Sequence, residues 1–141
     1  MNKKILAQGL IITCLIFFWA QSAAAMEKKT PVYGLFYKAN ELFKDNNYQE
    51  AIKEYEKILD MNVASGNLYY NLGNAYFEIG KFNKAICYYE KAYSYDSTLK
   101  STSYNLALAY IKINDLRRAV TTLKSLLEED PENLKVLEAL A

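Results

Sequence analysis

Apolar residues in the middle of the chain recur at intervals of three, four and seven positions, the spacing of one face of a helix. Two such runs follow each other closely, and a turn at Ile79-Gly80-Lys81 separates them. The pattern predicts two short helices joined as a hairpin, with these residues on their facing sides: Tyr69, Leu72 and Tyr76, then Ala85, Tyr89 and Ala92.

The same pattern occurs three times at a constant spacing. When the chain is aligned to itself without gaps, position 51 matches position 85, and position 85 matches position 119. A fixed period of this length is typical of stacked helical repeats, in which each unit buries its apolar face against its neighbours. The matched columns keep residue size: Ala39, Gly73 and Ala107; Leu42, Tyr76 and Tyr110; Tyr48, Phe82 and Leu116; Ala51, Ala85 and Ala119; Tyr55, Tyr89 and Leu123.

Turn residues and small residues support an all-α fold. Asn46-Asn47 and Asn114-Asp115 lie where Gly80 lies in the middle copy, and these residue types tolerate helix-ending conformations. Two prolines and 5 glycines in 141 residues are few for a fold with many strands and turns. We expect six of the 13 tyrosines to pack in the core, namely Tyr48, Tyr55, Tyr69, Tyr76, Tyr89 and Tyr110.

The period divides the chain into units. Thr30-Pro31 is a candidate helix start, and Pro131 precedes a fourth helix that would place Leu137, Leu140 and Ala141 in packing columns. Three interpretations of this last helix stay open: a minimal capping helix, an edge that a partner covers, or a chain that is a truncated version of a longer protein. The predicted limits are 1–25 for a signal peptide, 26–31 for a lead-in, 32–65, 66–99 and 100–133 for the repeats, and 134–141 for the start of a capping helix.

The segment 1–25 has the pattern of a secretory signal peptide. Lys3 and Lys4 precede an apolar stretch of about 12 residues, and Ala23-Ala24-Ala25 fits a cleavage site before Met26. The alternative is an uncleaved membrane anchor. Cleavage would leave Cys87 as a lone thiol, which we expect to be a packed helix residue and not an intermolecular partner.

Composition narrows the function. The chain has no histidine, which excludes Ser-His-Asp and Cys-His nucleophiles and the H-E-x-x-H zinc motif, and we expect no catalytic activity, metal or cofactor. Removal of the signal would leave 15 basic against 16 acidic side chains without a basic stripe, so we expect no nucleic-acid partner. We also expect no small-molecule substrate. The charges of the second helix read as a solvated outer face with two i, i+3 pairs: Lys53 with Glu56, and Glu54 with Lys57.

The segment YYNLGNAYFEIGKFNKAICYYEKAYSYD, residues 69–96, resembles the tetratricopeptide repeat family, and the resemblance extends from Val32 to about Asn133. It implies a right-handed superhelical stack of helix-turn-helix hairpins. The chain departs from the family where a first-helix tryptophan is usual, since Leu35, Tyr69 and Ser103 stand there.

The resemblance also implies that the first helices line a concave face that binds a protein or peptide. On the side that the packing columns leave free, aromatic rings offer apolar area and asparagines offer a donor and an acceptor to a peptide backbone. The predicted groove residues are Phe36, Tyr37, Asn40, Phe43, Tyr70, Asn71, Asn74, Phe77, Tyr104 and Asn105.

Some family members grip a terminal carboxylate with lysines, an arginine and asparagines. Asn40 and Asn71 match that clamp, but Phe36, Ser101 and Asn105 stand where its basic residues belong. We therefore expect no recognition of a carboxylate tail. A structural role for the asparagines is the competing interpretation.

The leading hypothesis is an exported, periplasmic or extracytoplasmic scaffold that binds its partner in this groove as part of an envelope complex. The run ANELFKDNNYQEAIKEYEKIL is also similar to exported repeat proteins of the bacterial Bat aerotolerance system. That resemblance implies an alternative, a membrane-anchored assembly factor with an uncleaved anchor in an inner-membrane complex.

Overall fold

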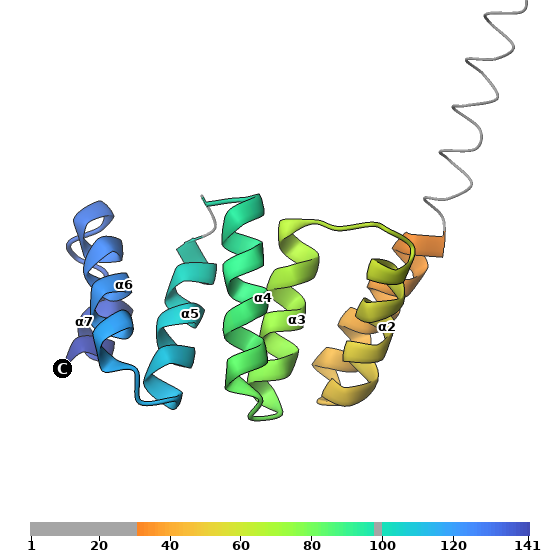
Figure 1. The fold of residues 1–141 in the computed structure, drawn as a ribbon, viewed down its shortest axis with the longest axis horizontal. Helices are drawn as coiled ribbons and strands as arrows, with labels where there is room; N and C mark the ends of the chain where they lie inside the picture. Colours follow the sequence, from red (N-terminus) through yellow and green to blue (C-terminus); the bar gives the residue numbers. More distant parts are fainter. Residues whose placement is uncertain (1–30, 98–99) are drawn as a thin grey trace, which may run out of the picture.

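The computed structural model describes residues 31–97 and 100–141, and the secondary structure in these ranges is entirely helical. The helices stand side by side in a row that follows the chain order (Figure 1). Residues 31–44 are helical. The later helices are α2 (Tyr48–Asp60), α3 (Gly66–Glu78), α4 (Phe82–Tyr95), α5 (Lys100–Lys112), α6 (Leu116–Glu129) and α7 (Leu134–Leu140).

Tight turns join the helices in pairs. Asn46, Gly80 and Asn114, which hold equivalent positions in the three copies, have φ angles of 61°, 72° and 61°. In the middle pair the Lys81 N–H donates to the Tyr76 carbonyl at 2.9 Å, which satisfies a carbonyl at the helix end, and the other two turns repeat this bond. The predicted all-α stack of helix-turn-helix hairpins is thus confirmed, and a glycine or asparagine ends each first helix because its φ is positive.

Side-chain caps fix where several helices begin. The Ser65 hydroxyl accepts a hydrogen bond from the Leu68 N–H at 3.2 Å at the start of α3. The Asp115 carboxylate accepts from the Arg118 N–H at 3.1 Å before α6. Each cap satisfies a backbone donor that has no partner within its own helix.

Alanines and one glycine allow the two helices of a pair to approach closely. Ala39, Ala51, Ala85 and Ala107 are fully buried. A Cβ added at Gly73 would lie 2.5 Å from ring atoms of Tyr89, so the tyrosine ring packs directly on the α3 backbone. The small columns of the sequence therefore mark the helix contacts.

The tyrosines expected in the core lie there to different degrees. Tyr55, Tyr76, Tyr89 and Tyr110 are buried. The two others are half-buried, Tyr48 with its ring 5.1 Å from Phe43 in an edge contact and Tyr69 with its ring 6.2 Å from Tyr88.

Two of the charges expected on a solvated outer face are structural. Glu54 is buried and accepts from Lys57 at 3.0 Å, the predicted pair, and also from Lys38 of the preceding helix at 2.8 Å. Hydrogen bonds from Lys38 and then Lys57 lower the pKa of the Glu54 carboxyl. Glu56 accepts instead from the Tyr76 hydroxyl of the next pair, at 2.7 Å. The outer-face interpretation is therefore wrong for both glutamates.

Two further predictions are corrected. Cys87 is exposed on α4, because its neighbour Ile86 and Tyr89 occupy the buried side of the helix. In α7 the buried residue is Val136, whereas Leu137 is 43% exposed. Leu137 corresponds to Tyr69, whose ring packs on Tyr88 in the second helix of its pair. In the part of the chain that the structure describes, α7 has no second helix beside it to make this contact.

The predicted signal peptide 1–25, the lead-in up to residue 30 and the cap at Thr30 lie outside the described residues. Within 31–97 and 100–141, no helix combines the length and apolar character needed to span a membrane.

Candidate binding groove

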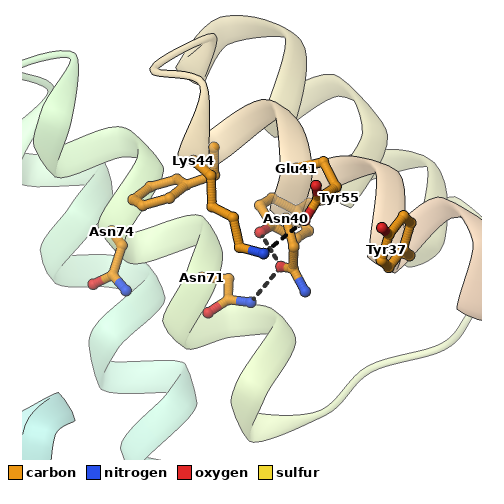
Figure 2. A pocket seen from close by; sticks show the side chains of 8 residues that line it. Tyr37, Asn40, Glu41, Lys44, Tyr55, Asn71 and Asn74 are labelled. Atoms are coloured by element: carbon orange, nitrogen blue, oxygen red, sulfur yellow. Dashed lines mark hydrogen bonds and ion pairs between the residues drawn. The ribbon is translucent and has the colours of Figure 1, made fainter.

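The first helices of the pairs form one side of the stack, and two adjoining pockets are hollowed into it. The first pocket, of about 340 Å³, lies between residues 31–44 and α3 (Figure 2). The second, of about 280 Å³, lies between α3 and α5. Phe43 and Asn74 line both pockets, so we treat them as one groove.

Seven of the ten predicted groove residues line these pockets: Tyr37, Asn40, Phe43, Asn71, Asn74, Phe77 and Asn105. Tyr37 stands out among them, since 68% of its surface is exposed. The exposed ring gives the groove an aromatic contact surface that no neighbouring ring covers in the described part of the chain.

The other three predicted residues do not line either pocket. Phe36 meets Tyr55 edge-on, with ring centroids 5.9 Å apart. The ring centroids of Tyr70 and Tyr89 lie 6.1 Å apart. Tyr104 packs against the core cluster around Leu123. These rings lean sideways onto second-helix residues, so that they support the groove without forming its pockets.

The asparagines form a repeating hydrogen-bond network. The Tyr55 hydroxyl donates to the Asn40 amide oxygen at 2.6 Å, and the Asn71 amide nitrogen donates to the same oxygen at 3.1 Å (Figure 2). This network, which we call the asparagine ladder, links the two helices of one pair and the first helix of the next. The competing interpretation, a structural role for the asparagines, therefore applies to the Asn40 amide oxygen, because its two hydrogen bonds link the helices of the stack.

The ladder recurs at the equivalent positions of the next repeat. The Tyr89 hydroxyl donates to the Asn74 amide oxygen at 2.8 Å, and Asn105 donates to it at 2.9 Å. Asn105 also donates to the Tyr70 hydroxyl at 3.2 Å. The network stops in the third pair, because Leu123 and Leu108 replace the tyrosine and the asparagine.

The ladder leaves some hydrogen-bonding capacity for a ligand. Among the described residues, no hydrogen bond engages the Asn40 amide nitrogen or the Asn71 amide oxygen. A donor and an acceptor side by side in the pocket match the C=O and N–H of an extended peptide.

The charges at the first pocket are already paired. Lys44 and Glu41 lie at its edge with 2.7 Å between the ammonium nitrogen and a carboxylate oxygen. The hydrogen bond to Glu41 raises the pKa of the Lys44 ammonium. Sequence reasoning missed this pair, although the i, i+3 spacing of opposite charges was the signal for it. The second pocket adds only Glu78 as a charged residue.

Two second-helix tyrosines also line the pockets, although sequence reasoning placed them only in the core. Tyr55 lines the first pocket and Tyr89 the second, although each is only 1% exposed. Burial raises the pKa of Tyr55 to about 12 and that of Tyr89 as well. Both phenols therefore stay protonated at neutral pH and donate to the ladder. In the described residues there is no cluster of His, Cys, Asp or Glu that could hold a metal ion.

Two tetratricopeptide repeat family models match the chain, one over residues 37–98 and the other over residues 80–141. A comparison with curated protein sequences gave no significant match.

Several solved structures share the fold. The first TPR of Spaghetti (RPAP3), bound to the HSP90 peptide SRMEEVD, is 26% identical with a TM-score of 0.72, over 79% of this chain and 88% of that one. The second TPR domain of human RPAP3, in complex with the HSP70 peptide SGPTIEEVD, is 22% identical with a TM-score of 0.71, over 79% and 92%. The Arabidopsis OM64 TPR domain is 20% identical with a TM-score of 0.70, over 77% and 89%.

Proposed function

Because the chain belongs to the tetratricopeptide repeat family, we propose that it is a scaffold that binds a protein or peptide partner in the groove around Tyr37, Asn40 and Asn71. The carrying observation is the free amide donor and acceptor of the two asparagines beside an exposed aromatic ring. Domains of this family are generally interaction modules without catalysis, and we propose the same for this chain.

The charges of the groove favour a neutral segment over an acidic tail. The RPAP3 domain with 26% identity is bound to a peptide that ends in Glu-Glu-Val-Asp. Here Lys44 is paired with Glu41, and Phe36 and Asn105 stand where the carboxylate clamp of the family has basic residues. A carboxylate entering this groove would lose its hydration without gaining a cation. The partner we propose is an internal peptide segment with an apolar or aromatic side chain for the first pocket.

We further propose that the scaffold is exported and works in an envelope complex. The support is the signal-like pattern of residues 1–25. A second candidate is a membrane-anchored assembly factor of a Bat-like complex, favoured by the apolar stretch after Lys4 if it stays attached. Mass spectrometry of the native N-terminus separates them, because a chain starting at Met26 has no anchor.

Site-specific photo-crosslinking in the full chain tests the groove. A photoreactive phenylalanine analogue replaces Tyr37 in one variant and Tyr33 in a control. Both tyrosines are exposed on the same helix, by 68% and 66%, but only Tyr37 lines a pocket. We expect a defined protein adduct at position 37 that is much weaker at position 33. Equal adducts at both positions, or none at position 37, would contradict the proposal.

A further inference from the structure

Four tyrosine rings of α3 and α4 lie in contact with one another on one side of the middle pair, three of them stacked and the fourth edge-on. Tyr76 and Tyr88 lie parallel, with ring centroids 5.3 Å apart and an interplanar angle of 5°. The ring centroids of Tyr88 and Tyr69 lie 6.2 Å apart, and those of Tyr69 and Tyr95 lie 5.4 Å apart. The ammonium of Lys91 lies over two of these rings, at 5.4 Å and 5.6 Å from their centroids. These four rings fill the space between α3 and α4 on this side.

The third pair keeps only one ring of this stack. Tyr110 corresponds to Tyr76, but small or charged residues replace the other three rings. The replacements at the equivalent repeat positions are Ser103 for Tyr69, Thr122 for Tyr88 and Glu129 for Tyr95.

Two hollows lie where the missing rings would be. One of about 240 Å³ is lined by Ser103, Thr122 and Glu129, among others. The other, of about 330 Å³, is lined by Tyr110 and Thr122, among others. Because Thr121 and Thr122 line both, they adjoin, and we call them together the third-pair hollow. It is lined mainly by α5 and α6, with Tyr93 of α4 and Ser97 at one side, and it shares no lining residue with the groove.

The hollow offers flat surfaces to an incoming ring. Tyr93, 47% exposed, forms one wall. The Arg118 guanidinium lies over the Tyr110 ring at 4.3 Å from its centroid, and 53% of its side chain remains exposed. A guanidinium that stacks on one ring can accept a second ring on its open face.

Of the charged side chains that line the hollow, three are basic and one is acidic. Beside the lining, the Glu90 carboxylate accepts a hydrogen bond from the Tyr110 hydroxyl at 2.9 Å. Lys100 and Glu129 pair at 3.3 Å, and Arg118 pairs with Asp115 at 2.6 Å. Arg117, exposed at the edge, has no ion pair within the described residues. One cation is therefore left to complement a negative charge on whatever binds.

We propose that the third-pair hollow docks a protein segment that inserts an aromatic side chain and carries an acidic residue beside it. The aromatic ring takes the place that Tyr69 and Tyr88 occupy one repeat earlier, and the acidic residue faces Arg117. This second docking surface lies on a different face from the groove, so that the scaffold can hold two segments at once.

An array of end-blocked peptides tests the proposal with the full chain as probe. Each peptide carries a central tyrosine or phenylalanine with aspartate neighbours, and matched sets replace the ring by alanine or the aspartates by lysines. We expect the aspartate-aromatic set to bind most strongly and to lose about tenfold in signal with either replacement. No preference for rings, or equal binding of the lysine set, would overturn the proposal.

Two variants locate the binding. Ser103→Tyr with Thr122→Tyr rebuilds the rings of the middle pair, and we expect loss of the peptide signal while Tyr37→Ala keeps it. Arg117→Glu changes only an exposed side chain, and it should reverse the preference from aspartate to lysine neighbours. Retention of the signal in the filled variant, or an unchanged charge preference in Arg117→Glu, would each contradict the hollow as the site.

Discussion

The Tyr89 hydroxyl donates a 2.8 Å hydrogen bond to the Asn74 amide oxygen, and the Tyr55 hydroxyl makes the same contact to Asn40 one repeat earlier. Each asparagine oxygen also accepts from an asparagine of the next pair. The ladder therefore couples the groove surface to the stacking of the pairs: the residues that face a ligand also set the spacing of the helices that form the groove.

Tyr89→Phe tests the ladder without changing ring packing. We expect a loss of about 1 kcal/mol in the free energy of unfolding, because the Asn74 oxygen loses one of its two donors in a half-buried site. Urea denaturation followed by circular dichroism measures it. Tyr37→Phe is the control, since its hydroxyl makes no hydrogen bond among the described residues and the ring is exposed. If both variants unfold at the same urea concentration as the parent, the ladder does not stabilise the fold.

Alkaline pH should destabilise the protein through its buried tyrosines. Burial raises the pKa of Tyr55 from 10.0 to about 12, and it raises those of Tyr76 and Tyr110 as well. A raised folded-state pKa means that the neutral phenol is favoured in the fold. The stabilisation is complete below pH 10, where both states are protonated, and it is lost as pH rises towards 12.

Thermal unfolding at a series of pH values measures this loss. For Tyr55 alone, the rise in pKa from 10.0 to about 12 corresponds to about 3 kcal/mol. Tyr55→Phe should flatten the decline between pH 10 and 12. A melting temperature that stays constant over this window in the parent protein would contradict the assignment of buried, neutral phenols.

Gly73 is a position where a single methyl group should matter. Its added Cβ would lie 2.5 Å from the Tyr89 ring, so Gly73→Ala must displace a buried side chain. The equivalent position in the first pair holds Ala39, which is fully buried in the same core cluster as Tyr55, so an alanine can be accommodated at this position of the repeat. We therefore expect Gly73→Ala to lower the free energy of unfolding by about 1 kcal/mol, which is at the low end for overpacked cores.

Gly34→Ala is the matched control for Gly73→Ala. Among the described residues, no atom beyond its chain neighbours and its own helix backbone lies within 4 Å of the added Cβ, and the residue is helical. The substitution should therefore raise the free energy of unfolding by about 0.5 to 1 kcal/mol. Chemical denaturation of the two variants should thus give effects of opposite sign. Equal stabilisation by both would show that the Tyr89 ring does not rest on the α3 backbone.

The repeat pattern predicted the fold because each matched column has one physical role in every copy. Gly80, Asn46 and Asn114 all adopt positive φ, and Ala51, Ala85 and Ala119 are all buried. Periodicity alone does not determine how far a side chain leans. It placed Tyr70 and Tyr37 together in the groove, although Tyr70 rests on Tyr89 and Tyr37 is exposed.

Departures from the repeat were harder to interpret from the sequence. Ser103 replaces a large residue of the column, and the sequence could not tell whether the pair would shift to fill the space. The structure keeps α5 and α6 in place and leaves the hollow. Cys87 shows the same limit, because the helical pattern around it is strong and yet its own side chain is exposed.

Thr102 provides the last prediction. It is fully buried at the start of α5, and its hydroxyl oxygen has no hydrogen-bond partner among the residues that the structure describes. The corresponding positions hold Leu68 and Val136, both buried and apolar. Thr102→Val keeps the shape and removes an unsatisfied polar group, so the variant should be more stable by about 1 kcal/mol.

Thr121→Val is the control for this substitution, since its hydroxyl is exposed and donates to the Arg117 carbonyl at 2.9 Å. We expect it to change stability by less than about 0.5 kcal/mol. Thermal and urea unfolding should therefore rank Thr102→Val above both the parent and Thr121→Val. A destabilised Thr102→Val would mean that the hydroxyl has a partner in solution, and a buried water molecule bridging it to the backbone would be the first to seek.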